Sequence, residues 1–307
     1  MIKVFGNNEH NSSTTSHGIW LELTNPNFDE VNQVAQMLDL SQGDLTAAMD
    51  LNEKNRFEKF NAYTLIIIDI PTKSNELDYK SIPLGIILIG KHVITVCYKE
   101  NQILNKFHES YEHKYASRHK VEFIYAILLE TTIEYQRALL SINKVREELE
   151  HNVKKIKDET ELISLHKLEV ILVHFFTSIK GNATVITKMI RYSETNKISD
   201  GKDLLDNIFI ENQQNLEMAQ IYREIISSTR ELFSSIMESR LNNVMKRLTS
   251  ITVILSIPTI ISGIYGMNLN PLGMPFSQIA NGFTILISII TLTCVLLAAL
   301  LKIKKLI

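Results

Sequence analysis

The sequence has few of the residues on which catalytic and disulfide-stabilised proteins depend. Only two cysteines, Cys97 and Cys294, occur among 307 residues, and they form no metal-binding or disulfide pattern. The chain also lacks a Gly-rich phosphate loop, a nucleophile elbow and a His-Glu-x-x-His motif. We therefore expect a protein that is not an enzyme and has no ATP site, and we expect no nucleic-acid partner.

Charged residues are missing from most of the C-terminal part of the chain. All 34 acidic residues precede Leu248, and no charged residue lies between Leu248 and Leu301. About 20 apolar residues in a helix cross a hydrocarbon core of about 30 Å. We expect a first transmembrane helix over 248–268, an external loop over 269–281 and a second transmembrane helix over 282–301.

Basic residues flank this uncharged interval on both sides. Lys246 and Arg247 precede it, and Lys302, Lys304 and Lys305 follow it. Because short flanks rich in Lys and Arg stay in the cytosol, both termini are expected there. The first residues show no basic region followed by an apolar stretch, so no cleaved signal peptide is expected. The expected location is the plasma membrane, as a multi-pass protein.

The chain before residue 120 mixes strand and helix signals. Apolar, largely β-branched runs predict strands over 19–23, 63–70, 84–89 and 92–97. Gly90-Lys91 fits a two-residue hairpin turn. Asn27 or Asp29 is expected to cap a first helix, and Ser41 a second. The polar residues 1–17 are expected to be loose, and the whole reads as an α+β domain with a mixed sheet.

From residue 120 onward the sequence predicts almost only helix. Residues 121–153 and 159–192 form an antiparallel pair around a corner at 154–158, and a polar break follows at 193–201. Asp203 opens a helix of roughly 100 Å, at about 1.5 Å per residue, that must pack against copies of itself or other helices. The expected segments are an α+β cytosolic domain, 1–119; a helical hairpin, 120–200; a stalk helix, 201–247; the two transmembrane helices with their loop; and a basic cytosolic tail, 302–307.

Polar residues recur every seven positions along this long helix, so they stay on one side with a drift of about 20° per heptad. The first polar row contains Glu217, Glu224, Glu231 and Glu238, and continues with Met245, Thr252, Thr259 and Gly266. The second polar row contains Ser228, Ser235, Asn242, Thr249, Ser256 and Gly263.

These rows have two interpretations. Ser, Thr and Gly let membrane helices pack closely, and the Glu positions can be a solvated face. Alternatively, several copies surround an axis, the carboxylates attract cations, and Met245 with Leu248 forms an apolar constriction. The shared register of the Glu row with Thr252 and Thr259 favours a water-filled ion path, because a merely solvated face need not match the polar face of a span.

The stretch Tyr265-Gly266-Met267-Asn268 ends the first apolar segment and resembles the signature of the CorA family of divalent-cation transporters. The resemblance covers nearly the whole chain. It includes Trp20, residues 55–60 (NRFEKF), residues 242–246 (NNVMK) and Met274-Pro275 in the loop. A Gly-Met-Asn triplet is common by chance, but at the end of a span in this architecture it is specific.

The resemblance implies a homopentameric, funnel-shaped channel in the lipid bilayer that carries Mg²⁺, with Co²⁺ and sometimes Ni²⁺. It implies an outer ring of Asn268 that meets the hydrated ion, presented by Gly266 and Met267, with Tyr265 supporting the loop. The residues that it places along the pore are Gly263, Thr259, Ser256, Thr252, Leu248, Met245 and Asn242. Mg²⁺ tends to keep its waters, which suits amide and hydroxyl ligands.

The sequence departs from the family pattern at several positions. Phe276 follows Met274-Pro275 where an acid is frequent, and residues 269–281 contain none. Ser256 replaces a common Met. The acids of the regulatory Mg²⁺ sites are partly lost, since Asn207 and Thr46-Ala47 stand at their positions. The acidic residues that could substitute are Asp44, Asp50, Asp206 and Glu211.

Two alternative functions remain open at this point. A transporter of the same architecture could carry Co²⁺, Ni²⁺ or Zn²⁺ instead, although Met267 favours the Mg²⁺ group. Softer metals prefer imidazole and thiolate ligands, and the polar rows offer neither. A two-span membrane sensor or scaffold without transport is the other possibility, and the continuation of the polar rows through the span argues against it.

Overall fold

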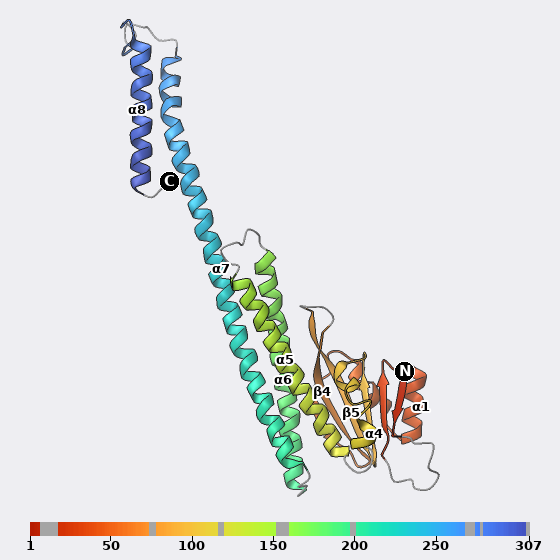
Figure 1. Ribbon diagram of the computed structural model, residues 1–307. Coiled ribbons are helices and arrows are strands. Elements are labelled where there is room, and N and C mark those ends of the chain that lie inside the picture. Colours follow the sequence, from red (N-terminus) through yellow and green to blue (C-terminus); the bar gives the residue numbers. More distant parts are fainter. Residues whose placement is uncertain are drawn as a thin grey trace. The chain divides into compact units, whose positions relative to one another are not determined.

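A six-stranded sheet forms the centre of the first part of the chain (Figure 1). The computed structural model describes residues 1–6, 18–73, 78–115, 120–151, 160–196, 201–267, 274–276 and 279–304. The strand order is β1-β2-β6-β5-β4-β3, and β2 pairs with β6 in parallel while the other neighbours are antiparallel. The strands are β1 (Ile2–Phe5), β2 (Trp20–Thr24), β3 (Arg56–Lys59), β4 (Tyr63–Lys73), β5 (Tyr79–Ile89) and β6 (His92–Cys97). The mixed sheet is therefore confirmed.

The chain divides into two units, residues 1–230 and 231–307, and the boundary falls within one long helix. The helices of the first unit are α1 (Phe28–Leu38), α2 (Gln42–Thr46), the short 3₁₀ helix η1 (Ala47–Met49), α3 (Gln102–Asn105), α4 (Tyr111–Lys114), α5 (Lys120–His151), α6 (Thr160–Thr195) and the start of α7 (Lys202–Tyr265). The second unit holds the rest of α7 and α8 (Gly282–Ile303).

Both faces of the sheet are covered in the first unit. Leu65 and Ile67 of β4 point to the side of α1, α2 and η1, whereas Ile66 and Ile68 point to the core shared with α5, α6 and α7. Successive side chains of a strand face opposite sides, so an apolar run without alternation indicates burial on both. Figure 1 shows this layering, with α1 on one side of the sheet and α5 and α6 on the other.

Two strands were not predicted. The expectation that residues 1–17 are loose is wrong for Ile2–Phe5, which pairs with β2, and residues 7–17 lie outside the described part. The ring of Phe5 stacks on Trp20 with centroids 4.5 Å apart. Arg56–Lys59 forms β3 at the other edge of the sheet. Both strands have only four residues, too few for an alternation to stand out.

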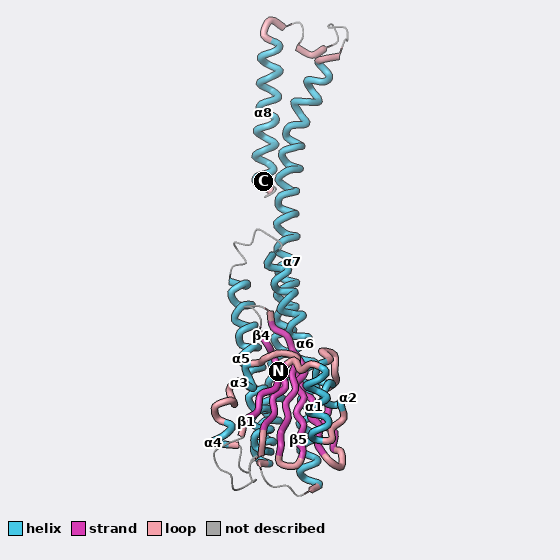
Figure 2. The backbone as a smooth tube through the Cα atoms, turned by 90° about the vertical axis from the view of Figure 1, so that its right-hand side faces the viewer, coloured by secondary structure: helices cyan, strands magenta, loops and turns pink. Residues whose placement is uncertain are grey.

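The remaining secondary structure largely follows the sequence. Asn27 is the N-cap of α1, where its side-chain oxygen accepts from the backbone N–H of Glu30 at 2.8 Å. Helix α6 continues to Thr195, three residues into the predicted polar break. The predicted corner at 154–158 lies outside the described residues. Figure 2 shows the helices of the first unit beside its sheet.

Among the described residues, three helices are long and apolar enough to cross a membrane by length and composition: Leu162–Thr195, Lys202–Tyr265 and Gly282–Ile303. The first of these lies in α6, whose apolar side chains Leu168, Leu172 and Phe175 are fully buried in the first unit. An apolar face that is already covered by protein explains its hydropathy without a membrane. The other two helices include residues 248–265 of the first segment and residues 282–301 of the second segment that were expected to cross the membrane.

Candidate ion pathway along helix α7

Helix α7 has one buried face in the first unit, and the first polar row lies opposite to it. The buried positions follow a spacing of three, four or seven residues: Leu205, Ile208, Asn212, Asn215, Ala219, Ile226 and Thr229. The side-chain amide of Asn215 donates to the carbonyl of Thr132 in α5 at 2.7 Å, and that of Asn212 to Ile179 in α6 at 3.1 Å. Glu217 follows Asn215 by two residues, or about 200° around the helix. Glu217 and Glu224 are accordingly exposed.

The polar rows are also exposed in the second unit. Glu231, Glu238, Met245, Thr252 and Thr259 are exposed members of the first polar row. The second polar row is exposed at Ser235, Asn242, Thr249 and Gly263, and Ser256 is half-buried. Leu248 and Met245, the expected constriction, leave half of their surface or more uncovered. Within one protomer, therefore, hardly any side chain of either row is used for packing.

Three hydroxyl groups in the apolar part of α7 share one arrangement. Thr252 donates to the carbonyl of Leu248 at 2.9 Å, Ser256 to Val253 at 2.8 Å and Thr259 to Leu255 at 2.9 Å. A hydroxyl has one proton to donate and two lone pairs. Because each hydroxyl bonds to the helix backbone, its oxygen keeps lone pairs that can accept hydrogen bonds from groups beside the helix. Such a surface suits water molecules whose protons point away from a cation.

Packing within this chain does not explain why position 263 is a glycine. A Cβ atom built at this position has nothing within 4 Å. Gly in a helix is less favourable than Ala by about 1 kcal/mol, so its presence where space is open has no benefit within one chain.

Helix α8 contacts the opposite side of α7. The thiol of Cys294 donates weakly to the carbonyl of Ile254 at 3.8 Å, and Ser250 is buried. Ile254 precedes Ser256 by two residues and follows Thr252 by two, so it faces away from both hydroxyls by about 200°. Cys294 is thus a partly buried residue at the contact between α7 and α8.

The expected filter motif lies at the end of α7. Tyr265 is the last helical residue, and its hydroxyl donates to the carbonyl of Pro275 at 2.6 Å. The N–H of Gly266 still bonds to Ser262 at 2.9 Å, and Met267 is exposed. Asn268 lies outside the described residues. The structure therefore gives Tyr265 a hydrogen bond to the loop region and leaves the Asn268 ring as an expectation.

The loop returns closely to the start of α8. A Cβ on Gly282 would stand 1.9 Å from the carbonyl oxygen of Phe276, so only glycine fits there. Phe276 itself has a φ of 63°, a conformation that is rare for a residue with a side chain. Phe276 is therefore part of a tight return to α8 in this chain.

The four acidic candidates for regulation occupy two separate regions. Asp44 in α2 accepts a hydrogen bond from the hydroxyl of Tyr63; burial, and secondly this bond, raises the pKa of Tyr63 to about 12. Asp50 accepts from the backbone N–H of Asn52 at 2.9 Å. Asp206 and Glu211 lie on α7. Within the described residues of one protomer, no group of three or more His, Cys, Asp or Glu side chains is placed to hold a metal ion.

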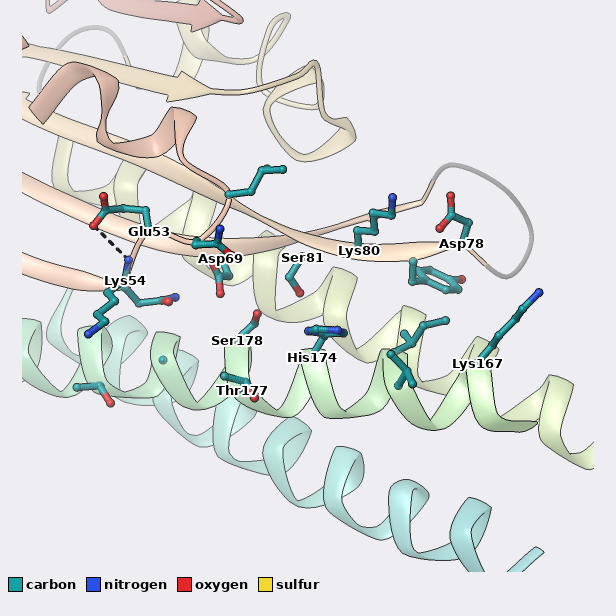
Figure 3. Close-up of a pocket in the computed structure, with 18 of the residues that line it drawn as sticks. Glu53, Lys54, Asp69, Asp78, Lys80, Ser81, Lys167, His174, Thr177 and Ser178 are labelled. Carbon is teal, nitrogen blue, oxygen red and sulfur yellow. Dashed lines mark hydrogen bonds between the residues drawn. The ribbon is translucent and has the colours of Figure 1, made fainter. Parts of the chain in front are cut away.

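One polar cluster was not identified from the sequence. Asp69 lies on β4 beside a cavity of about 1130 Å³ (Figure 3), and the Asn182 side chain of α6 bonds to its backbone N–H at 2.9 Å and its carbonyl at 2.8 Å. Burial raises the pKa of the Asp69 carboxyl, and the neighbouring Ser178 and Asn55 side chains lower it by less. The available signal was a single acid within the otherwise apolar strand 63–70, because a carboxylate in such a run requires polar partners.

A sheet-and-helix part followed by two long apolar helices, one of which carries exposed polar rows, is an arrangement typical of a membrane protein with a large extramembrane part. A family model described as "CorA-like Mg2+ transporter protein" matches residues 15–305. The chain therefore belongs to the family of CorA-like Mg²⁺ transporters.

Curated relatives and solved structures agree with this assignment. A cobalt/magnesium transport protein CorA of Methanocaldococcus jannaschii is 25% identical over 278 residues, which cover 88% of this chain and 86% of the relative. A protein of the same description from Thermotoga maritima is 22% identical, covering 93% and 82%. The complete structure of the Methanocaldococcus jannaschii CorA magnesium transporter superposes with a TM-score of 0.83 at 23% identity, covering 96% of this chain and 93% of that one. The last comparison shows a shared fold.

Proposed function

We propose that this protein is a homopentameric channel for Mg²⁺ uptake, with α7 of each subunit beside a central path. The two relatives described above are named for the transport of cobalt and magnesium. The observation that carries the proposal is the position of the hydroxyl oxygens of Thr252, Ser256 and Thr259, which lie on the two polar rows within the otherwise apolar part of α7. Hydrated Mg²⁺ presents only water protons, and such a surface can bind them without removing the waters.

The other parts of α7 have complementary roles in this proposal. Carboxylates of the first polar row concentrate cations at the cytosolic end of the path, and Met245 with Leu248 forms the apolar constriction that closes it. Asn268 forms the outer ring that receives the hydrated ion. The negative-inside membrane potential drives uptake, worth about 4.6 kcal/mol for a divalent ion at about 100 mV. No ATP is needed.

We further propose that cytosolic Mg²⁺ closes the channel by binding between subunits. The acidic residues available for this are Asp44, Asp50, Asp206 and Glu211. Because they form no metal-binding group within the described part of one protomer, such sites require neighbouring copies. Asp44 must also give up its hydrogen bond from Tyr63, or share it, to bind an ion.

Ion flux into liposomes tests the proposal. Purified wild-type protein should admit Mg²⁺, and Asn268→Ala should reduce the flux strongly. Thr252→Val and Thr259→Val keep the side-chain shape and remove the acceptor, so each should also lower the flux. Thr291→Val is the matched control, because Thr291 on α8 bonds to Ile287 at 2.9 Å in the same manner.

Two results would contradict specific parts of the proposal. If wild-type protein admits no Mg²⁺, uptake of this ion is not its function. If Thr252→Val, Thr259→Val and Thr291→Val conduct equally, the hydroxyl rows do not line the path. Competition with Co²⁺ distinguishes the related alternative: a cobalt or nickel transporter would take up those ions in preference to Mg²⁺. A sensor or scaffold would show no flux with any of them.

A further inference from the structure

Basic side chains gather at one end of the paired helices α7 and α8. After Glu238 the chain has no acidic residue and six basic ones: Arg240, Lys246, Arg247, Lys302, Lys304 and Lys305. Lys305 lies outside the described residues, and the other five side chains are exposed. Within the described part of the chain, no ion pair is formed by Lys246, Arg247, Lys302 or Lys304. The positive charge of these four side chains is therefore open to a partner.

The two helices bring these charges to one depth. They run in opposite directions side by side (Figures 1 and 2), and the sulfur of Cys294 lies 3.8 Å from the carbonyl oxygen of Ile254. Eight residues on from Cys294 is Lys302, and eight residues back from Ile254 is Lys246, about 12 Å along either axis. Lys302 is thus level with Lys246, and Arg247 is only about 1.5 Å of helix rise away.

The arginines of α7 lie on the side of α8, opposite the first polar row. Ser250 is buried and lies one turn before Ile254, the residue that contacts α8. Arg247 precedes Ser250 by three residues and Arg240 precedes Arg247 by seven, so both share that side. Met245 of the first polar row is two residues from Arg247, or about 200° around the helix. These arginines therefore point away from the proposed ion path.

Apolar side chains continue directly beyond the basic ones. Ile251 and Leu255 on α7, and Leu296 and Leu300 on α8, are exposed. Helices with such a surface are surrounded by acyl chains in a bilayer, which places the lipid phosphates at the level of the basic side chains. A phospholipid with a net negative headgroup matches both the apolar and the basic part of this surface.

We propose that Arg247 and Lys302, with Lys246 and Lys304 beside them, bind the anionic headgroup of a phospholipid at this membrane surface. The proposal rests on the transmembrane placement of α7 and α8 and does not depend on the ion that is carried. Clusters of about four to eight Lys and Arg beside a span are typical of anionic-lipid recognition. Basic flanks also orient a span, but that effect depends on their number and requires neither a common depth nor a common side.

Brominated lipids, which quench Trp fluorescence on contact, test this site in the full-length protein. The native Trp20 is fully buried, so Leu300→Trp and Phe283→Trp each add one exposed probe near opposite ends of α8. In phosphatidylcholine vesicles, the probe at position 300 should detect brominated phosphatidylglycerol binding about fivefold or more better than brominated phosphatidylcholine. The probe at position 283, where α8 begins without charged residues, should detect no preference. Salt at about 1 M should weaken the preference.

Charge variants in the Leu300→Trp protein locate the effect. Arg247→Gln combined with Lys302→Gln should remove the preference, and Arg247→Lys combined with Lys302→Arg should keep it because the charge stays. Lys188→Gln is the matched control, because it removes the same charge at an exposed position of α6, and it should keep the full preference.

Three results would overturn the lipid proposal. They are equal quenching by both lipids at position 300, a preference that survives in the double Gln variant, and an equally strong preference at position 283. None of these measurements involves ion flux. A protein that carries no Mg²⁺ can still show the lipid preference, and a conducting protein can lack it, so this proposal and the transport proposal are rejected independently.

Discussion

Replacing Asn182 by Ala should destabilise the first unit more than most single substitutions. Strand β3 pairs with β4 only from Thr64 to Ile67, so the backbone of Asp69 has no strand neighbour on that edge. The Asn182 side chain, which is 3% exposed, replaces the missing strand neighbour, because it bonds to both the backbone N–H and the backbone C=O of Asp69. Ala leaves an N–H and a C=O without their partner.

The magnitude follows from these two groups. A buried polar group that loses its partner costs about 1–3 kcal/mol. Water from the adjacent cavity can partly replace the lost bonds, so we expect a loss of about 2–4 kcal/mol in the free energy of unfolding. In a unit of this size, each kcal/mol of lost stability lowers the midpoint of thermal unfolding by about 2–4 °C, so the midpoint should fall by roughly 5–15 °C.

Two measurements check this expectation. Thermal unfolding reports the change in global stability, and hydrogen exchange reports local opening at the backbone amide of Asp69. If the free energy of opening falls by about 2 kcal/mol, the protection of this amide should fall by about 30-fold or more. Asn196→Ala is the control, because Asn196 is exposed and bonds only to Tyr192, so its effect should stay within about 0.5 kcal/mol. Equal midpoints and equal Asp69 exchange in the Asn182→Ala variant and the wild type would refute the reasoning.

Two further substitutions give expected outcomes. Asp69→Asn should remove a pH dependence of the free energy of unfolding. Burial raises the pKa of Asp69 above its ordinary value of 3.8, so the wild type should lose stability relative to this variant as the pH rises from about 4. Parallel pH profiles of unfolding for the two proteins would contradict this expectation. Gly263→Ala should leave thermal stability unchanged or slightly higher, since a Cβ meets nothing within 4 Å, yet lower Mg²⁺ flux in liposomes. Unchanged flux would show that Gly263 does not face the path.

The features predicted correctly are those that repeat along the chain. The long apolar helices α7 and α8 and the β-branched strands β4, β5 and β6 have patterns that depend only on neighbouring positions, so the sequence contains the whole signal for them. The N-cap at Asn27 is similar, since Glu30 three residues later completes a capping box. Strands β1 and β3 were not predicted because each has only four residues and lies at an edge of the sheet. Pairing with β2 or β4 defines them, and their own residue patterns do not.

The cavity around Asp69 could not be predicted for a different reason. Its walls come from the segment at 51–55, from β4, from β5 and from α6. Asn55 and Asn182 are 127 residues apart and each is unremarkable in its own segment. Only the packing of α6 on the sheet places them together, and Gly181 permits the approach, because a Cβ there would lie 2.7 Å from Asn55. Contacts of this kind depend on tertiary structure and have no period that a sequence reveals.

The polar rows of α7 have different physical origins in its two parts. In the first unit their period follows from packing, because the buried positions from Leu205 to Thr229 repeat in the same way on the opposite face. In the apolar part, Thr252 bonds to its own helix, which also reduces the cost of facing lipid. Thr291 on α8 has the same local structure. A flux difference between Thr252→Val and Thr291→Val therefore reports on what surrounds α7 in the assembled protein, because the two hydroxyls do not differ locally.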